Sequence, residues 1–514
     1  MGLMALEVLG IWIGSPAELP DLRREGIFRF LRQLIEHLLQ DYPLRIEVWC
    51  QEFNLARVRE LFAEMASRPQ LAERVVFCTE RNAARRFPGK ISTPCRLGLS
   101  LAGALVHGLK IAAFRLKDLL KRHGRWLLPL AALLAVMGGF LASRSWFFRG
   151  SRARFILLPV LALALLGGVV FRRGLEGLAI RSWEFFKQTL NVLPGAANRY
   201  SAADCFLVQN FDMANAWTLR RQKIVNLHDL FTTEFAPLFS RSGFDRRQLF
   251  QGEEARRCAA RLAVDGSFFV CNSDHIRRAH ALTMIPGLKE ERTAFIFLPA
   301  IIPEGIMDKI GPREETLSPF PIRGDYIFYP SHVRPYKNIV TLLRALKIVL
   351  DRGCDLSLVL TGDLRSDPVC SEFAGQNDLW GRIVLTHDLS EQEMYGLYRH
   401  AALTAVPTLS EGGFPWQALE AMAMGTPVVM SRIPVVEERL RYHGLSGSPS
   451  GLQLFSPMDE NDLAERIMFV CRHREQVLAE QEVYRQKLLA YDWHKLSSQY
   501  HRLFDDLLAG GGHD

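Results

Sequence analysis

The chain has 514 residues, which is too many for one ordinary hydrophobic core, so two or three domains are expected. Its 48% hydrophobic and 23% charged residues are typical of a globular protein and exclude a disordered or collagen-like one. The formal net charge of +8 is local, because eleven basic residues and one acid between Arg115 and Arg173 give that window +10 and leave the remainder at −2. Nucleic acid is therefore not an expected partner.

The first 90 residues alternate strand-like and helix-like patterns. Residues 5–14, 44–50 and 74–80 predict buried strands, and apolar residues at helical spacing predict helices over 26–40 and 56–66. A strand–helix–strand alternation of this kind is typical of a parallel sheet.

Two uncharged hydrophobic runs interrupt this alternation, Trp126–Ala142 and Phe155–Phe171. As helices rising about 1.5 Å per residue, each would span roughly 26 Å, slightly less than a hydrocarbon core of about 30 Å. Arginines at every end and aromatic residues in the connector fit a membrane surface. The runs predict a membrane hairpin, either spanning or re-entrant, that anchors the protein at the cytoplasmic face of the inner or plasma membrane with lipids as partners. The alternative is a pair of buried helices in a soluble core.

The alternation resumes near residue 199 and continues beyond a linker-like stretch at 304–324. Residues 203–210, 222–230 and 266–273 predict short buried strands. A second series from Tyr326 contains a predicted helix over 338–353, with Asn338 as its N-cap.

These patterns predict an α/β fold of two Rossmann-like domains with an inserted hydrophobic helical hairpin. The predicted ranges are 1–94 and 191–304 for the N-terminal domain, 95–190 for the membrane-associated insertion with helices at 126–142 and 155–171, 305–490 for the C-terminal domain, and 491–514 for a C-terminal helix.

The most informative motif is SEGGFPWQALEAMAMGTPVV, from Ser410 to Val429. Backbone N–H groups of Gly412, Gly413 and Phe414 directly precede a predicted helix, and this position favours phosphate oxygens because of the helix dipole. Glu420, inside the helix, is expected to accept hydrogen bonds from vicinal hydroxyls of a donor molecule. The alternative is an ordinary glycine turn with a surface glutamate.

The motif resembles the donor-binding signature of the retaining family-four glycosyltransferases, in which an EGFG-type loop precedes LEAMA-x-G-x-PVV. Arg334-Pro335-Tyr336-Lys337 is similar to that family's R-x-x-K element, whose two cations hold a nucleotide diphosphate. Fixed positive charge stabilises a diphosphate leaving group without a metal ion. The alternative for the two cations is a solvated loop.

Further matches support the resemblance. Gly362 follows a predicted strand, and the segment that includes Leu389 resembles a region lining the base and ribose pocket. VNLHDL matches the element in which the family keeps a histidine contacting the donor sugar, which assigns that role to His228, with a histidine capping a buried strand as the alternative. Asp229 is expected to shape the loop.

The sequence departs from the family pattern in two places, the spacing between Glu411 and Glu420 and the single glycine Gly26. Glu411 and Glu420 enclose eight residues where the family has seven, so Gly412 stands at the family spacing and the role of Glu411 is open. Gly26 is a single glycine where the family often has a pair, at a position associated with the acceptor.

The resemblance implies two domains facing across a cleft, in the arrangement known as GT-B, with the nucleotide on the C-terminal domain and the acceptor on the N-terminal one. It implies transfer of a hexose from a GDP- or UDP-sugar, with retention, to a saccharide or lipid-linked acceptor in cell-surface polysaccharide or glycolipid synthesis. His228, Arg334, Lys337 and Glu411 are the predicted catalytic residues. No D-x-D triplet is present and the cysteines form no C-x-x-C pair, so neither a metal nor another cofactor is expected. The alternatives are a non-catalytic subunit of a polysaccharide-synthesis complex and a phosphate-dependent glycosidic enzyme of the same fold.

Overall fold

The structure is a computed structural model that describes residues 5–14, 19, 26–63, 65, 68–83, 193–209, 215–236, 246–386, 389–445 and 452–510. The predicted insertion over 95–190, including both hydrophobic runs, lies outside the described residues. Among the residues that are described, no helix combines the length and the apolar character that crossing a bilayer would require.

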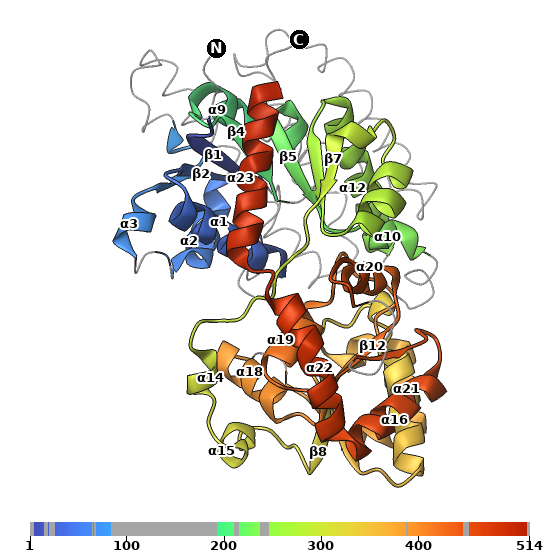
Figure 1. The fold of residues 1–514 in the computed structure, drawn as a ribbon. Helices are drawn as coiled ribbons and strands as arrows, with labels where there is room; N and C mark the ends of the chain where they lie inside the picture. The colour runs from blue at the N-terminus through green and yellow to red at the C-terminus, as the bar shows by residue number, and fades with distance from the viewer. Residues whose placement is uncertain are drawn as a thin grey trace, which may run out of the picture.

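Two parallel sheets organise the described chain, one in each half (Figure 1). The N-terminal sheet has seven strands in the order β3-β2-β1-β4-β5-β6-β7, and the C-terminal sheet has six in the order β10-β9-β8-β11-β12-β13, counted over the described ranges. The prediction of two Rossmann-like domains is confirmed. The strands form because short apolar runs rich in β-branched and aromatic residues are covered on both faces, as parallel sheets require.

The bounds of the N-terminal elements are as follows: β1 (Val8–Ile13), α1 (Gly26–Asp41), β2 (Arg45–Cys50), α2 (Leu55–Leu61), α3 (Pro69–Ala72), β3 (Val75–Cys78), α9 (Leu193–Tyr200), β4 (Cys205–Val208), β5 (Gln222–Leu227), α10 (Phe231–Glu234), α12 (Arg246–Val264), β6 (Phe268–Cys271), α13 (Asp274–Ile276) and β7 (Thr293–Phe295).

The bounds of the C-terminal elements are as follows: α14 (Ile306–Lys309), α15 (Arg313–Leu317), β8 (Asp325–Tyr329), the short 3-10 helix η9 (Pro335–Lys337), α16 (Ile339–Asp351), β9 (Leu356–Leu360), α17 (Pro368–Gln376), β10 (Ile383–Leu385), α18 (Glu391–His400), β11 (Leu403–Val406), α19 (Trp416–Ala423), β12 (Val428–Ser431), α20 (Pro434–Tyr442), β13 (Gln453–Phe455), α21 (Glu460–Arg472), α22 (Arg474–Leu489) and α23 (Trp493–Gly510).

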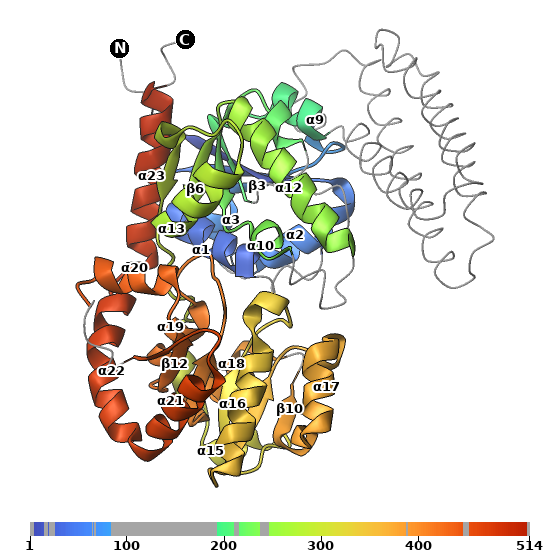
Figure 2. The same ribbon diagram turned by 90° about the vertical axis from the view of Figure 1, so that its right-hand side faces the viewer.

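The chain crosses between the domains twice. After β7 it passes into the C-terminal domain, and after α22 it returns, so that α23 packs against α1 on the N-terminal domain (Figures 1 and 2). The Tyr500 hydroxyl donates a hydrogen bond of 2.8 Å to Asn226 Oδ1 in β5, and the Trp493 indole N–H donates one of 2.8 Å to the carbonyl of Ala300 in the first crossing segment. The C-terminal helix is therefore part of the N-terminal domain's packing.

Helix α20 provides a further contact between the domains. The Glu438 carboxylate accepts hydrogen bonds from the backbone N–H groups of Asp274 and His275, at 2.7 and 2.8 Å. These two residues begin α13, where unpaired N–H groups favour a negative charge. The contact holds the two sheets with the carboxyl ends of β5 and β6 directed toward the C-terminal domain.

Candidate functional site

The C-terminal part of the site forms where the strand order of the sheet reverses, between β8 and β11. Ligands of open α/β sheets bind outside the carboxyl ends of the strands at such a position. The R-x-x-K segment follows β8, and the segment containing Glu411 and the two glycines follows β11. Both predicted donor-binding segments therefore leave the sheet at the point where a ligand is expected.

Asn338 connects these two segments. Its side-chain amide donates hydrogen bonds to the carbonyls of Pro407 and Pro457, at 3.0 and 2.7 Å, from a left-handed backbone conformation with φ of 55°. It stands at the start of α16 as predicted, but its side chain does not cap the helix N–H groups. The R-x-x-K turn is thus fixed to the end of β11 by a buried amide.

The two cations of the R-x-x-K segment have different surroundings. Arg334 is exposed, and its guanidinium makes no hydrogen bond or ion pair with any described residue. Lys337 Nζ lies 2.5 Å from Glu411 Oε1, with the two side chains only 12% and 15% exposed. The site therefore offers one unpaired positive charge beside a nearly buried ion pair, and Glu411 holds Lys337 in place.

The glycine segment lies directly against the N-terminal domain. A Cβ atom on Gly412 would come within 2.4 Å of the His228 carbonyl oxygen, and one on Gly413 within 3.2 Å of the Asn272 carbonyl oxygen. The Ser273 hydroxyl donates a hydrogen bond of 3.0 Å to the carbonyl of Gly412. Glycine is required at position 412 because the backbones of the two domains approach each other too closely for any side chain.

The backbone N–H groups at this segment are free to bind an anion. No described residue accepts a hydrogen bond from Gly412, Gly413 or Phe414, and the next residues begin α19. Phe414 itself is buried, 7% exposed, which anchors the segment to the C-terminal core. Pro415 stands at the N-cap position, one residue before the helix.

His228 provides the N-terminal side of the site. It follows β5 and is 9% exposed, and its Nδ1 lies 3.0 Å from Asn272 Nδ2, while its Nε2 has no hydrogen-bond partner. Burial lowers the pKa of His228 to about 4, and the backbone of Gln209 opposes this only in part. The ring is therefore neutral at physiological pH.

Asp229 lies close to the same charges. Burial raises the pKa of Asp229 to about 6; the hydrogen bond from the Phe231 N–H and the charges of His280 and Lys337 lower it, whereas Glu411 raises it. The hydrogen bond has a length of 3.2 Å and gives the loop its shape, as expected for this residue. The carboxyl group is also electrostatically linked to both members of the Lys337–Glu411 pair.

Glu420 has a different environment from the one expected for a hydroxyl-binding residue. Its carboxylate is 3% exposed and accepts hydrogen bonds from Tyr398 at 2.8 Å and Tyr395 at 3.4 Å, with Arg29 Nη2 also at 3.4 Å. Burial raises the pKa of Glu420, although Arg29 and the tyrosines oppose the shift. Burial is the largest single influence on the pKa of Arg29 and lowers it, but Glu420, Tyr395, Glu391 and Tyr398 together outweigh burial, and the net direction is upward. The structure thus joins Glu420 to α1 of the opposite domain.

The two remaining predicted residues, Gly362 and Leu389, are packed within the C-terminal domain. Gly362 packs against the segment after β8, since a Cβ atom there would meet the Ser331 carbonyl oxygen at 2.7 Å. Leu389 packs partly buried against the hydrophobic core just before α18.

The sequence did not indicate two residues that belong to this interface, Arg29 and Asn272. Arg29 meets Glu420 from 391 positions away, and Asn272 meets His228 from 44 positions away. Arg29 is identified only by the packing of the two domains, whereas Asn272 is placed beside His228 by the pairing of β5 with β6 within the N-terminal sheet.

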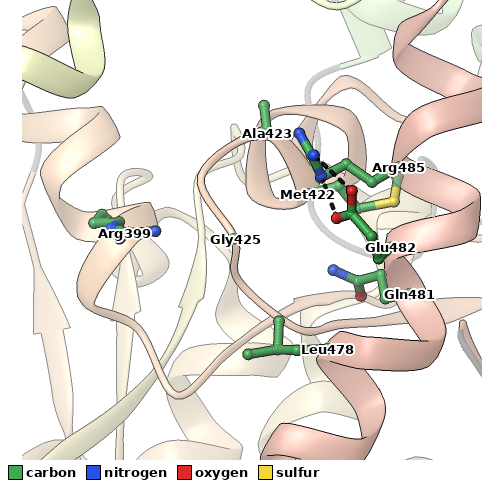
Figure 3. A pocket seen from close by; sticks show the side chains of 8 residues that line it. All are labelled: Arg399, Met422, Ala423, Gly425, Leu478, Gln481, Glu482 and Arg485. Atoms are coloured by element: carbon green, nitrogen blue, oxygen red, sulfur yellow. Dashed lines mark hydrogen bonds and ion pairs between the residues drawn. The ribbon is translucent and has the colours of Figure 1, made fainter.

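One hollow of the C-terminal domain lies away from these residues. It has a volume of about 310 Å³ and is lined by Gly425 and by residues of α18, α19 and α22, among them Arg399 and Arg485, and it includes none of the predicted site residues (Figure 3). Its charges are satisfied locally, because Arg485 pairs with Glu482 at 2.5 Å and Arg399 donates to the Met424 carbonyl at 2.8 Å. Among the described residues no group of three His, Cys, Asp or Glu side chains could hold a metal ion.

Comparisons with known proteins show that the chain is similar to glycosyltransferases. Residues 324–473 match the family described as glycosyl transferases group 1. D-inositol 3-phosphate glycosyltransferase from Corynebacterium jeikeium is 25% identical over 283 residues, covering 50% of this chain and 62% of the relative. MMP alpha-(1->4)-mannosyltransferase from Mycolicibacterium hassiacum is 30% identical over 169 residues, covering 32% of this chain and 37% of the relative.

Solved structures extend the likeness to both domains. HepE from Anabaena, crystallised with UDP and glucose, aligns with a TM-score of 0.54 at 13% identity over 98% of this chain and all of that one. At this identity the match concerns the fold. The C-terminal domain is therefore similar to the group 1 glycosyltransferases, and the described chain has the two-domain GT-B fold.

Proposed function

We propose that this protein is a retaining hexosyltransferase that transfers a sugar from a GDP- or UDP-sugar to a saccharide or lipid-linked acceptor. The observation that carries the proposal is the joint position of the two C-terminal segments and His228. An unpaired Arg334 guanidinium, the Lys337–Glu411 pair and free backbone N–H groups lie where the sheet order reverses, directly opposite a neutral histidine.

Each group has a defined part in the proposed reaction. Arg334, Lys337 and the N–H groups of Gly412 and Gly413 bind the diphosphate and stabilise the charge that develops as it departs. His228 contacts the donor sugar. Because the leaving phosphate can accept the proton of the acceptor hydroxyl, no strong protein base is needed. Neither a metal nor another cofactor has a part in this scheme.

The names of similar proteins support the substrate class. The relatives include a D-inositol 3-phosphate glycosyltransferase and a mannosyltransferase, and one structure of the same fold holds UDP and glucose. The hydrophobic runs at 126–142 and 155–171 fit an acceptor presented at the cytoplasmic face of a membrane, as in polysaccharide or glycolipid synthesis. Anchoring to the surface raises the effective concentration of enzyme at such an acceptor.

The second candidate is a non-catalytic subunit that retains the fold. It is favoured by one observation, the engagement of the Glu420 carboxylate by Arg29, Tyr395 and Tyr398, which leaves this residue no exposed surface for a ligand. The altered spacing between Glu411 and Glu420 points in the same direction.

The test is binding and hydrolysis of UDP-, GDP- and ADP-sugars by the detergent-solubilised protein. The Arg334→Ala/Lys337→Ala variant removes both cations, and Lys347→Ala removes a lysine of α16 that only pairs with Asp351. Binding of one sugar nucleotide that is lost in the double variant and kept in Lys347→Ala supports the transferase and identifies its donor. Failure of every sugar nucleotide to bind supports the non-catalytic subunit.

A further inference from the structure

The surroundings of His228 define which of its ring nitrogens carries the proton. His228 and Asn272 stand at equivalent positions beyond the paired strand ends Leu227 and Cys271, so their side chains meet at the edge of the sheet. Asn272 Nδ2 lies 3.0 Å from His228 Nδ1, and both residues are more than nine-tenths buried.

A carboxamide nitrogen can only donate hydrogen bonds. The ring nitrogen that faces it must therefore accept, which means that Nδ1 carries no proton. Since burial keeps the ring neutral, with a pKa of about 4, its one proton belongs to Nε2. No charged side chain is among the causes of this pKa, although Asp229, Glu411, Lys337 and His280 all lie in the neighbouring loop network.

The Nε2 atom is buried and makes no hydrogen bond of normal length and angle with any described residue, although the backbone carbonyl of Gln209 is close enough to raise the pKa of the ring. A buried donor that the protein itself satisfies poorly usually serves a ligand or an ordered water in native proteins. The backbone of Gln209, at the end of β4, acts on this ring, and the strand order of the N-terminal sheet reverses between β1 and β4. This is the position at which an open α/β sheet binds its ligand.

We propose that Asn272 is a positioning residue that holds His228 as the Nε2–H tautomer, so that this N–H donates a hydrogen bond to an oxygen of the sugar bound between the domains. The inference rests on the proposed function for the identity of the ligand. It assigns His228 the role of a neutral donor and excludes that of a general base, because Nδ1 is occupied by Asn272 and Nε2 already carries the proton.

Asn272 also connects this tautomer to the docking of the glycine segment. Its backbone carbonyl lies next to Gly413, and the following Ser273 donates its hydroxyl to the carbonyl of Gly412. One strand end therefore positions both the histidine and the segment proposed to bind the diphosphate. The contact aligns the sugar-binding and phosphate-binding groups of the two domains.

The tautomer is measured directly by NMR of the protein labelled with ¹⁵N-histidine, without any substrate. His228→Gln identifies the His228 signals by their disappearance. The expected wild-type result is a protonated Nε2 and an unprotonated Nδ1 that persists from pH 8 to pH 5. A protonated Nδ1, or a ring that becomes charged near pH 6–7, would overturn the proposal even if the enzyme transfers sugar.

Variants test the function of the tautomer. Asn272→Asp replaces the donor by an acceptor of the same shape, so Nδ1 should become protonated, the pKa of His228 should rise, and kcat/KM should fall by about 10-fold or more with a new dependence on pH. His228→Gln keeps an N–H close to the Nε2 position and should retain more activity than His228→Asn, which mimics Nδ1. Equal losses in these two variants, or an unchanged kcat/KM in Asn272→Asp, would refute the role of the Nε2–H donor.

Failure of the inference can be told apart from failure of the proposed function. If the wild type has the expected tautomer but binds no sugar nucleotide, the proposed function is refuted and the assignment of the proton to Nε2 stands.

Discussion

Substitution of Gly412 by alanine tests whether the close approach of the domains is needed for transfer. The added Cβ atom would lie 2.4 Å from the His228 carbonyl oxygen, which is 1.0 Å less than the 3.4 Å at which ordinary contact begins. This oxygen belongs to the backbone, so no side-chain rotation can relieve the contact. Gly412 is not among the described glycines with positive φ, so alanine should not distort the segment itself. The domains must therefore separate locally by about 1 Å, and a misplacement of this size costs about 100-fold in rate.

The assay separates binding from transfer. Binding of the nucleoside diphosphate is measured by calorimetry and should change by less than about 3-fold, because the cations remain in place, whereas kcat/KM for transfer should fall by about 100-fold. The matched control is Gly381→Ala, since a Cβ atom there would meet nothing within 4 Å. Wild-type transfer by Gly412→Ala, or an equal loss in Gly381→Ala, would refute the reasoning.

Three further predictions concern charges of the site. Lys337→Ala should weaken binding of the nucleoside diphosphate by about 10- to 100-fold in calorimetry, while Lys347→Ala should bind as the wild type does. Arg29→Met leaves the buried Glu420 carboxylate without its cation and should destabilise the protein by about 3 kcal/mol at pH 8. Because the pKa of Glu420 is already raised, the protein should keep its stability at acidic pH and lose it as the pH rises through that pKa. A loss of stability in thermal unfolding that does not depend on pH would contradict this. Asp229→Asn removes a carboxyl whose pKa is raised from 3.8 to about 6, so it should stabilise the protein by about 3 kcal/mol at pH 8 and by less than about 1 kcal/mol at pH 4. Equal Tm changes at both pH values would refute the assignment.

The sequence patterns predicted the sheets and helices well where periodicity was strong. Apolar spacing placed a helix over 26–40 and another over 338–353, close to the observed α1 and α16. Parallel strands were predictable because each is a short buried run between helical segments.

The candidate site was predictable only where its residues are neighbours in sequence. Arg334 and Lys337 share one turn, and Glu411, Gly412 and Gly413 share one loop, so local spacing was sufficient. The environment of Glu420 was not predictable, because its carboxylate is set by residues on α1 and α18 that no local pattern connects to it. The role of Asn272 was not predicted because the pairing of β5 with β6, which brings it to His228, joins segments that are distant in sequence.

The return of α23 to the first domain has a consequence for the order in which the protein can fold during synthesis. The Asp41 carboxylate at the end of α1 pairs with His494 at 2.8 Å, and Tyr500 completes the buried polar contact of Asn226. Residues 493–510 are synthesised only after the whole C-terminal domain. The apolar face of α1 and β5 that α23 covers therefore stays exposed while the second domain folds. Domains of a chain usually fold in order as they emerge. Here the first domain to appear is the last to be completed, because its packing is finished only when α23 has been made.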